Sequence, residues 1–194
     1  MNICIYGASS AAIDKTYISD GEKLGSIMSE RNHNLVFGGG ASGLMGAVAR
    51  GMSAIGKGKI IGIAPSFMNV DGILYDGCSD FLYSETMRER KQLMDENSDA
   101  FIVTPGGIGT FDEFFEILTL KQLGRHNKPI AILNTNGYYD HLKSFLQNSI
   151  DEKFMNPACA DLIYFSENPE EIIDYIENYV PTENTLSAFK PIKE

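Results

Sequence analysis

Residues 100–118 read AFIVTPGGIGTFDEFFEIL. An apolar run, Ala100 to Thr104, is followed by a glycine-rich turn at residues 105–109 and then by a segment whose apolar side chains recur at helical spacing. Short apolar runs bounded by turns are typical of buried strands, and a strand, a turn and a helix form the repeating unit of a parallel sheet. This stretch therefore predicts a strand over 100–104 and a helix from Thr110 to Leu123.

The same alternation continues along the rest of the chain. Six more strands are expected at Asn2 to Tyr6, Asn34 to Phe37, Lys59 to Ala64, Asp80 to Tyr83, Pro129 to Leu133 and Leu162 to Phe165. The other helices are expected at Thr16 to Arg31, Leu44 to Ile55, Ser84 to Asn97, Gly137 to Ile150 and Pro169 to Tyr179. The pattern predicts an α/β protein, with a mostly parallel sheet of about seven strands and helices on both faces. Residues 1–180 are expected to form one nucleotide-binding domain, and residues 181–194 an irregular C-terminal tail.

Composition limits which ligands the protein can be expected to bind and where in the cell it is expected. The 194 residues carry a formal net charge of −10, which disfavours binding to a nucleic-acid polymer. The apolar runs are too short to span a bilayer, and no basic leader precedes the first one, so we expect a cytoplasmic protein that binds no membrane. The three cysteines and three histidines are scattered without metal-ligand spacing. We therefore expect structural thiols, no metal and no cofactor.

Three unusual turns follow strands whose carboxyl ends share one edge of the predicted sheet. They are residues 7–10, which include Ser9, residues 38–46, which include Gly39 and Gly40, and residues 105–110. Ligands of open parallel sheets bind at that edge, so the turns are expected to converge on one crevice. Gly38, Gly40 and Gly43 form G-x-G-x-x-G, which predicts either phosphate contact or only tight packing. The third strand ends in Ala64-Pro65-Ser66, without the acid that binds a dinucleotide ribose, so NAD is not expected.

The turn at residues 105–110 has two interpretations. Its glycines leave backbone N–H groups open to a phosphate, and Thr110 adds a hydroxyl at the positive end of a helix. Thr110 and Glu113 also form T-x-x-E, the pattern of a capping box, which is the more common role for such a pair on local grounds. The turn alone does not decide between a phosphate site and a capped helix.

The helix expected over residues 84–97 favours a ligand. At 100° per residue, Arg90 and Lys91 fall near the apolar face defined by Met87 and Met94, whereas the other charged residues lie on the opposite arc. Cations near a buried face need an anion. Either Glu113 or a ligand phosphate would provide it.

The helix expected over residues 110–123 has apolar residues on two sides. One arc, expected to be core, holds Phe111, Phe114, Phe115, Ile117 and Leu118, and the other holds Leu120 and Leu123. A helix that is apolar on both flanks is covered twice. This pattern predicts a homodimer.

The motifs taken together resemble the Lonely Guy family of cytokinin riboside 5'-monophosphate phosphoribohydrolases, long labelled lysine decarboxylase-like proteins. The resemblance rests on Gly38-Gly39-Gly40 with Gly43-Leu44-Met45-Gly46, on Met87-x-x-Arg90-Lys91, on Pro105-Gly106-Gly107-x-Gly109-Thr110-x-x-Glu113, and on Gln122-Leu123-Gly124-x-His126-x-Lys128-Pro129. It implies a modified Rossmann fold, commonly dimeric, that releases an adenine-type base from a nucleoside 5'-monophosphate. It also implies a catalytic pair, Arg90 and Glu113.

The same resemblance implies which residues contact the nucleotide, namely Lys91, Gly107, Ile108, Gly109, Thr110 and Thr119. Glu116, one turn beyond Glu113, is a plausible helper. The family usually has a glutamate that contacts the base shortly after the third strand, whereas residues 65–77 here contain only Asp71 and Asp76 as acids. The base that is preferred therefore stays open.

Two other functions remain as alternatives. The fold also resembles that of molybdenum-cofactor carriers, which would bind a nucleotide or cofactor without turnover. A pyridoxal phosphate decarboxylase would need a Schiff-base lysine, and the sequence singles out none. The joint presence of Arg90 and Glu113 favours the hydrolase, because a phosphate binder has no evident need for both.

Overall fold

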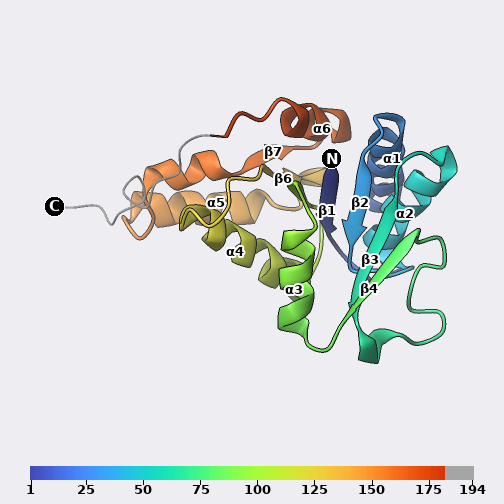
Figure 1. Ribbon diagram of the computed structural model, residues 1–194. Helices are drawn as coiled ribbons and strands as arrows, with labels where there is room; N and C mark the ends of the chain where they lie inside the picture. Colours follow the sequence, from blue (N-terminus) through green and yellow to red (C-terminus); the bar gives the residue numbers. More distant parts are fainter. Residues whose placement is uncertain (182–194) are drawn as a thin grey trace.

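A computed structural model describes residues 1–181 and contains one sheet of seven parallel strands (Figure 1). The strands are β1 (Asn2–Tyr6), β2 (Asn34–Phe37), β3 (Ile60–Pro65), β4 (Asp80–Ser84), β5 (Ala100–Val103), β6 (Ile130–Leu133) and β7 (Tyr164–Ser166). Their order is β4-β3-β2-β1-β5-β6-β7, and every neighbouring pair is parallel. From β1 the chain adds β2, β3 and β4 toward one edge of the sheet, and it then returns to place β5 on the other side of β1. This reversal marks the crevice where such sheets bind ligands.

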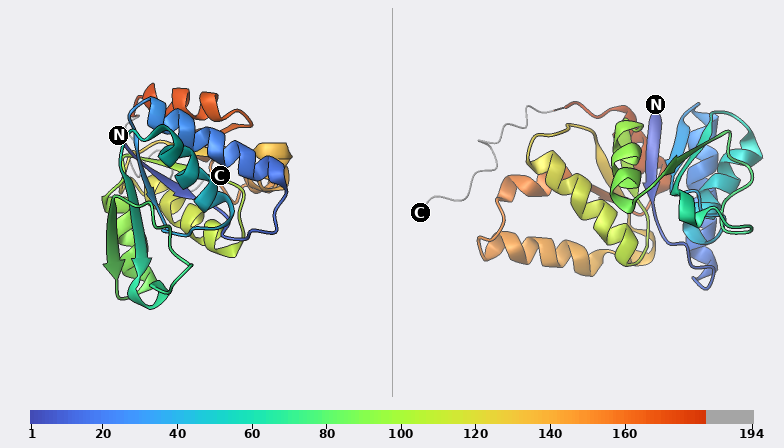
Figure 2. Two further views of the ribbon diagram at one scale, coloured as in Figure 1. Left: turned by 90° about the vertical axis from the view of Figure 1, so that its right-hand side faces the viewer. Right: turned by 60° about the horizontal axis from the view of Figure 1, so that its bottom comes forward.

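Helices cover both faces of the sheet, as the sequence predicts. Their bounds are α1 (Lys15–Glu30), α2 (Gly43–Ile55), α3 (Met87–Glu96), α4 (Ile108–Gln122), α5 (Asp140–Asp151) and α6 (Pro169–Glu177), with 3-10 turns η1 (Ser66–Met68), η2 (Thr135–Gly137) and η3 (Pro157–Leu162). Figure 2 shows α1 and α2 side by side with α6 next to α1. Helices α3, α4 and α5 lie on the opposite face.

Alternating side chains of the strands produce two cores. Ile3 and Ile5 of β1 pack with α1, α2 and α6, whereas Cys4 and Tyr6 pack with α3 and α4. The five inner strands are covered on both faces and read as continuous apolar runs. The edge strands differ, because β4 is mostly exposed and β7 is half-buried. Each buried isoleucine or leucine contributes about 1.5–3 kcal/mol to folding.

The start of α3 differs from the prediction by three residues. The helix begins at Met87 because Thr86 caps it: the Thr86 hydroxyl accepts from the Glu89 N–H, and the Glu89 side chain accepts from the Thr86 N–H. This reciprocal pair is a capping box. It fixes where α3 starts and so where Arg90 lies.

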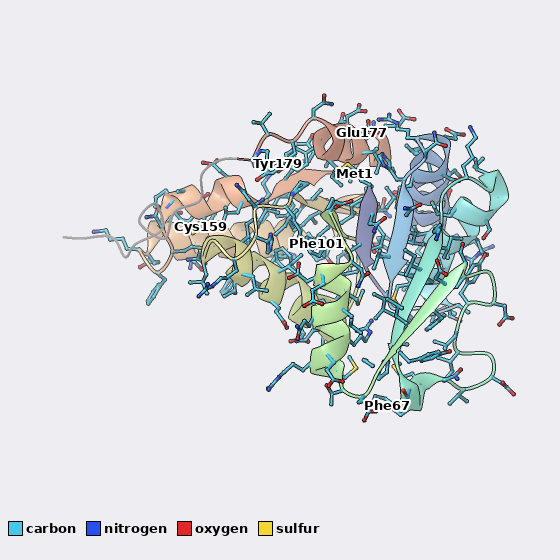
Figure 3. The ribbon with its side chains drawn as sticks, in the orientation of Figure 1. Met1, Phe67, Phe101, Cys159, Glu177 and Tyr179 are labelled. Atoms are coloured by element: carbon cyan, nitrogen blue, oxygen red, sulfur yellow. The ribbon has the colours of Figure 1, made fainter. Side chains whose placement is uncertain are left out.

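Two features complete the description of the chain. No helix of residues 1–181 is long and apolar enough to cross a membrane. The expected irregular tail lies, apart from Pro181, at residues 182–194, outside the described residues. In Figure 3, Met1 marks the amino edge of the sheet, and Phe67, just after β3, lies at the opposite, carboxyl edge. The crevice lies at that carboxyl edge.

Candidate active site

The three turns predicted to converge are hydrogen-bonded to one another. The Ala8 N–H donates to the Pro105 carbonyl (3.0 Å), and the Leu44 N–H donates to the Ala8 carbonyl (2.9 Å). Gly43 has a φ of +63°, and a Cβ there would lie 2.5 Å from the Ala8 oxygen. Glycine is needed at this contact, which confirms the packing interpretation of Gly43.

The turns enclose a pocket of about 580 Å³ at the carboxyl edge of the sheet. It includes eight of the residues predicted from the sequence: Ser9, Gly40, Arg90, Gly107, Ile108, Gly109, Thr110 and Glu113. Its remaining lining comes mainly from α2, from the segment between β3 and β4, and from the start of α3. A pocket of this size accommodates a small ligand such as a mononucleotide.

The glycine-rich turn ends at the N-terminus of α4. The helix begins at Ile108, its N-cap is Gly107, and no side chain caps it. The capping-box interpretation of Thr110 and Glu113 is therefore wrong, because both residues already lie inside the helix. The first N–H groups of α4 have no partner within the helix and face a pocket, which is the arrangement that binds phosphate at helix N-termini.

Two tyrosine hydroxyls donate hydrogen bonds to backbone carbonyls in and next to this turn. The Tyr138 hydroxyl donates to the Gly106 carbonyl (2.7 Å), and the Tyr139 hydroxyl donates to the Thr104 carbonyl (2.8 Å). Tyr139 is buried, and burial raises the pKa of its hydroxyl, so it stays a neutral donor at physiological pH. The turn is therefore preorganised before any ligand binds.

Arg90 and Glu113 form a buried ion pair at the pocket. The Arg90 Nη1 donates to the Glu113 Oε1 (2.7 Å), and its Nε donates to the Ile63 carbonyl (3.1 Å). The side chains of Arg90 and Glu113 are 9% and 11% exposed. Gly38 leaves room for the guanidinium, since a Cβ there would lie 2.2 Å from Arg90 Nη2. The first glycine of G-x-G-x-x-G thus serves the ion pair.

The environment of Glu113 has opposing effects on its pKa. Burial raises the pKa of the carboxyl group, and the charge and hydrogen bond of Arg90 oppose that rise. The net pKa is raised. A carboxylate with a raised pKa is a stronger proton acceptor than an exposed one. The hydrogen bond from Arg90 holds this carboxylate in one orientation.

Four predicted residues lie outside the lining of the pocket. Lys91 Nζ pairs with Asp112 (3.0 Å) and with Glu116, so Lys91 and Glu116 bridge α3 and α4. Thr119 lies on an exposed groove along α4, and Gly39 packs on Phe81. The Lys91 side chain is 17% exposed, which agrees with the prediction that it faces inward, and its amine is paired with the carboxylates of Asp112 and Glu116.

Sequence reasoning missed the wall formed by residues 66–77. This segment is attached to the second turn by the Ala41 N–H, which donates to the Ile73 carbonyl (2.9 Å), and by the Tyr75 N–H, which donates to the Gly39 carbonyl (2.8 Å). Asp71 and Asp76, the only acids in the segment, are exposed and outside the pocket lining. The sequence contained one signal of this wall, namely the apolar residues Met68, Ile73 and Leu74 in a stretch that otherwise resembles a loop.

Comparison with known proteins identifies the family. A family model described as "Possible lysine decarboxylase" matches residues 45–176. Cytokinin riboside 5'-monophosphate phosphoribohydrolase LOG2 of Arabidopsis thaliana is 36% identical, with 96% of this chain and 92% of the relative covered. The chain belongs to the Lonely Guy family. Another relative in the family, LOG1 of Arabidopsis thaliana, is 35% identical over 97% of this chain and 88% of its own length.

Solved structures support the family's fold. A molybdenum cofactor binding protein from Rippkaea orientalis has a TM-score of 0.67 at 20% identity, with 91% of this chain and 93% of that chain covered. A Moco carrier protein from Chlamydomonas reinhardtii has a TM-score of 0.69 at 20% identity, covering 91% and 94%. At this identity the likeness concerns the fold alone.

The decarboxylase label of the Lonely Guy family model does not fit the pocket. No lysine contributes to the pocket lining among residues 1–181, and Lys91 is held by two carboxylates outside it. A pyridoxal phosphate enzyme needs a lysine amine that can reach the cofactor aldehyde. The residues present therefore do not fit that cofactor.

Proposed function

We propose that this protein hydrolyses the N-glycosidic bond of a purine nucleoside 5'-monophosphate, including N6-modified ones, to give the free base and ribose 5-phosphate. The observation that carries the proposal is the Arg90–Glu113 pair, buried beside the uncapped N-terminus of α4 in one pocket. The names of relatives at about 35% identity support the same reaction.

The geometry suits the two ends of such a substrate. The N–H groups of α4 and the Thr110 hydroxyl would bind the 5'-phosphate, with Gly107 and Gly109 leaving the approach open, since a Cβ at either would meet nothing within 4 Å. Ser9 and Gly40 also line the pocket. A phosphate bound at the N-terminus of α4 would place the ribose next to Glu113, because Glu113 lies about one turn further along the helix.

Glu113 has the properties that glycosidic hydrolysis needs. As the bond to the base breaks, positive charge develops on the ribose ring, and a carboxylate on that side stabilises it. With its raised pKa, Glu113 also accepts a proton from the attacking water, while the bonding electrons leave with the base. The water oxygen forms the new bond to the anomeric carbon.

Arg90 is proposed to act through Glu113. Its Nη1 and Nε are used by Glu113 and by the Ile63 carbonyl, so the guanidinium holds the carboxylate in one orientation and keeps part of its population ionised. In this proposal Glu113 is the catalytic residue and Arg90 its positioning residue.

A second copy of the chain is proposed to cover the outer face of α4. Ile108 is 87% exposed, Phe115 39% and Leu123 45%, so the assignment of Phe115 to the core is wrong, although Phe114, Ile117 and Leu118 are buried. Thr119 lies on the same groove. An antiparallel α4 from a partner would bring its Thr119 toward the first turn of this α4, which is how Thr119 would reach a nucleotide.

The reaction is tested by incubating the purified protein with AMP and N6-benzyl-AMP and following free base by chromatography. We expect release that falls at least about 100-fold in Glu113→Gln, because a general base contributes about that factor or more. Bound nucleotide that stays intact in the wild type would favour the carrier alternative instead.

The dimer is tested separately by light scattering on wild type and Phe115→Lys. A dimer that becomes monomeric in the variant is expected. A monomeric wild type would contradict this part of the proposal without affecting the chemistry.

A further inference from the structure

A second pocket lies next to α5, apart from the crevice at the carboxyl edge of the sheet. It has a volume of about 280 Å³ and is lined by residues of α4, α5 and β7 and of the segment 155–163. Among residues 1–181, the two pockets have no lining residue in common. In Figure 3, Cys159, which lines this second pocket, lies far to the left of Phe67 at the carboxyl edge. The α5 pocket is therefore a separate site.

The lining of the α5 pocket is mainly apolar. Its largest contributors are Leu118, Leu146, Ile150, Met155, Ile163 and Phe165. Helix α5 has no buried residue, and the half-buried Leu146 and Ile150, four residues apart, share one side of it. A helix that packs on a filled core buries its apolar side, whereas this side borders the pocket. Apolar cavities of this kind exclude water and bind apolar molecules.

Lys143 adds a positive charge to this apolar lining. Its side chain is exposed, so its amine lies at the mouth of the pocket, with Nζ 5.7 Å from the centroid of the Phe165 ring. Within the part of the chain that the structure describes, the amine has no carboxylate partner, and no aspartate or glutamate lines the pocket. Gln147, one turn further along α5, donates its amide N–H to Asp151 (2.8 Å). Lys143 is thus the cation available to a ligand.

The size and charge of the α5 pocket limit the class of ligand. A volume of about 280 Å³ is just below the usual range of ligand pockets, which begins at about 300 Å³, so the ligand is smaller than a typical cofactor. A phosphate carries more charge and more acceptor oxygens than one lysine satisfies. A single carboxylate on a hydrocarbon group matches both the one cation and the apolar interior.

We propose that the α5 pocket binds a small apolar carboxylate, with the hydrocarbon group against Leu146 and Ile150 and the carboxylate at Lys143. The proposal is independent of the N-glycosidic reaction, because Arg90 and Glu113 do not line this pocket. It concerns a second ligand of the same protein.

Calorimetric titration with octanoate and with octylammonium is the first test. The two probes carry the same chain length and opposite charges. Octanoate is expected to bind with a Kd of about 1 mM or lower, and at least about 5-fold more tightly than octylammonium. The net charge of −10 favours the cation at any non-specific site, so a preference for octanoate reports the local charge of Lys143. Equal affinities, or a preference for octylammonium, would overturn the proposal.

Variants of Lys143 test the role of the cation. Lys143→Met keeps an apolar side chain but removes the charge, and it is expected to lose the preference for octanoate. Lys143→Arg keeps the charge and is expected to behave like the wild type. Because residue 143 is exposed, both variants are expected to fold. A preference for octanoate that persists in Lys143→Met would overturn the assignment of the carboxylate to Lys143.

A pair of matched variants tests the location of the hydrocarbon group. Leu146→Trp adds bulk to the α5 pocket and is expected to weaken octanoate binding at least about 10-fold, because a close-packed site has no room for both. Leu142→Trp is the control: it makes the same exchange on α5, but Leu142 lines the separate groove that contains Phe111 and Phe115. It is expected to leave the Kd unchanged. Equal weakening in both variants, with both folded by thermal melting, or no weakening in Leu146→Trp, would overturn the proposed site.

Discussion

Arg90→Met would remove the cation that neutralises Glu113. The carboxylate would remain in place, because residue 113 is only 9% exposed and lies inside α4. Breaking a buried ion pair from one side costs about 3–5 kcal/mol. For a chain of this size that loss lowers the melting temperature by about 6–20 °C.

The pH dependence of this loss identifies its cause. Burial already raises the pKa of Glu113 while Arg90 opposes the rise, so removing Arg90 raises the pKa further. A carboxyl group whose pKa is higher in the folded state than in the unfolded state costs stability where it is ionised, and the cost disappears as pH falls through the folded-state pKa. The gap in stability between wild type and variant should therefore narrow from about pH 8 to about pH 5.

The assay is urea unfolding, which measures the free energy of unfolding of the wild type, of Arg90→Met and of a double variant at both pH values. The double variant Arg90→Met, Glu113→Leu is the control, because replacing a buried pair by apolar residues is often neutral or stabilising. It should recover most of the stability but no activity. A single variant that loses less than about 1 kcal/mol, or a double variant as unstable as the single one, would refute the role of Arg90 as partner of a buried charge.

Three other changes have expected outcomes. Thr110→Val should raise KM for the nucleotide about 10- to 150-fold with little change in kcat, because it removes one hydrogen bond to a charged phosphate, which is about 1.5–3 kcal/mol; steady-state kinetics measure this, and an unchanged KM would exclude phosphate contact. Gly38→Ala should lower kcat and the melting temperature together, since its Cβ would lie 2.2 Å from Arg90 Nη2; full activity would show that the guanidinium can move without loss. Lys121 is fully buried, and burial lowers its pKa from 10.5 to about 8, so the wild type should gain stability as pH rises between these values. Lys121→Met should lose that slope in urea titrations, and a retained slope would assign it to another group.

Much of the fold could be predicted because strand burial leaves a direct pattern. All seven strands were located from their apolar runs. For the five inner strands, these runs reflect burial on both faces of the sheet. The convergence of the three turns also followed, because the carboxyl ends of parallel strands share one edge. Helical spacing indicated that Arg90 needs an anion, which could be Glu113 or a ligand phosphate, and the structure shows that Glu113 is paired with it.

The errors have local physical causes. Thr110 and Glu113 matched a capping box, but α4 starts two residues earlier at Ile108, where Gly107 provides the N-cap. The real box, Thr86 and Glu89, has the same spacing in the sequence and was missed. Only the position of a helix start distinguishes the two, and boundaries are the least reliable part of a sequence prediction.

Tertiary pairing explains the remaining differences. Lys91 was expected at the nucleotide, but its amine is held by Asp112 and Glu116 across the α3–α4 contact, which no local pattern reveals. The apolar wall at residues 66–77 was missed because it has neither helical nor strand periodicity. It forms only by attachment to residues 39–41 of the second turn.

The central claim is that the protein cleaves the bond between ribose and base with water. The most direct measurement is the product balance from AMP and wild-type protein: free adenine, ribose 5-phosphate and inorganic phosphate quantified in one reaction. We expect adenine and ribose 5-phosphate in equal amounts and no inorganic phosphate, with both products reduced at least about 100-fold in Glu113→Gln. AMP recovered intact, or adenosine and phosphate in place of adenine, would contradict the account.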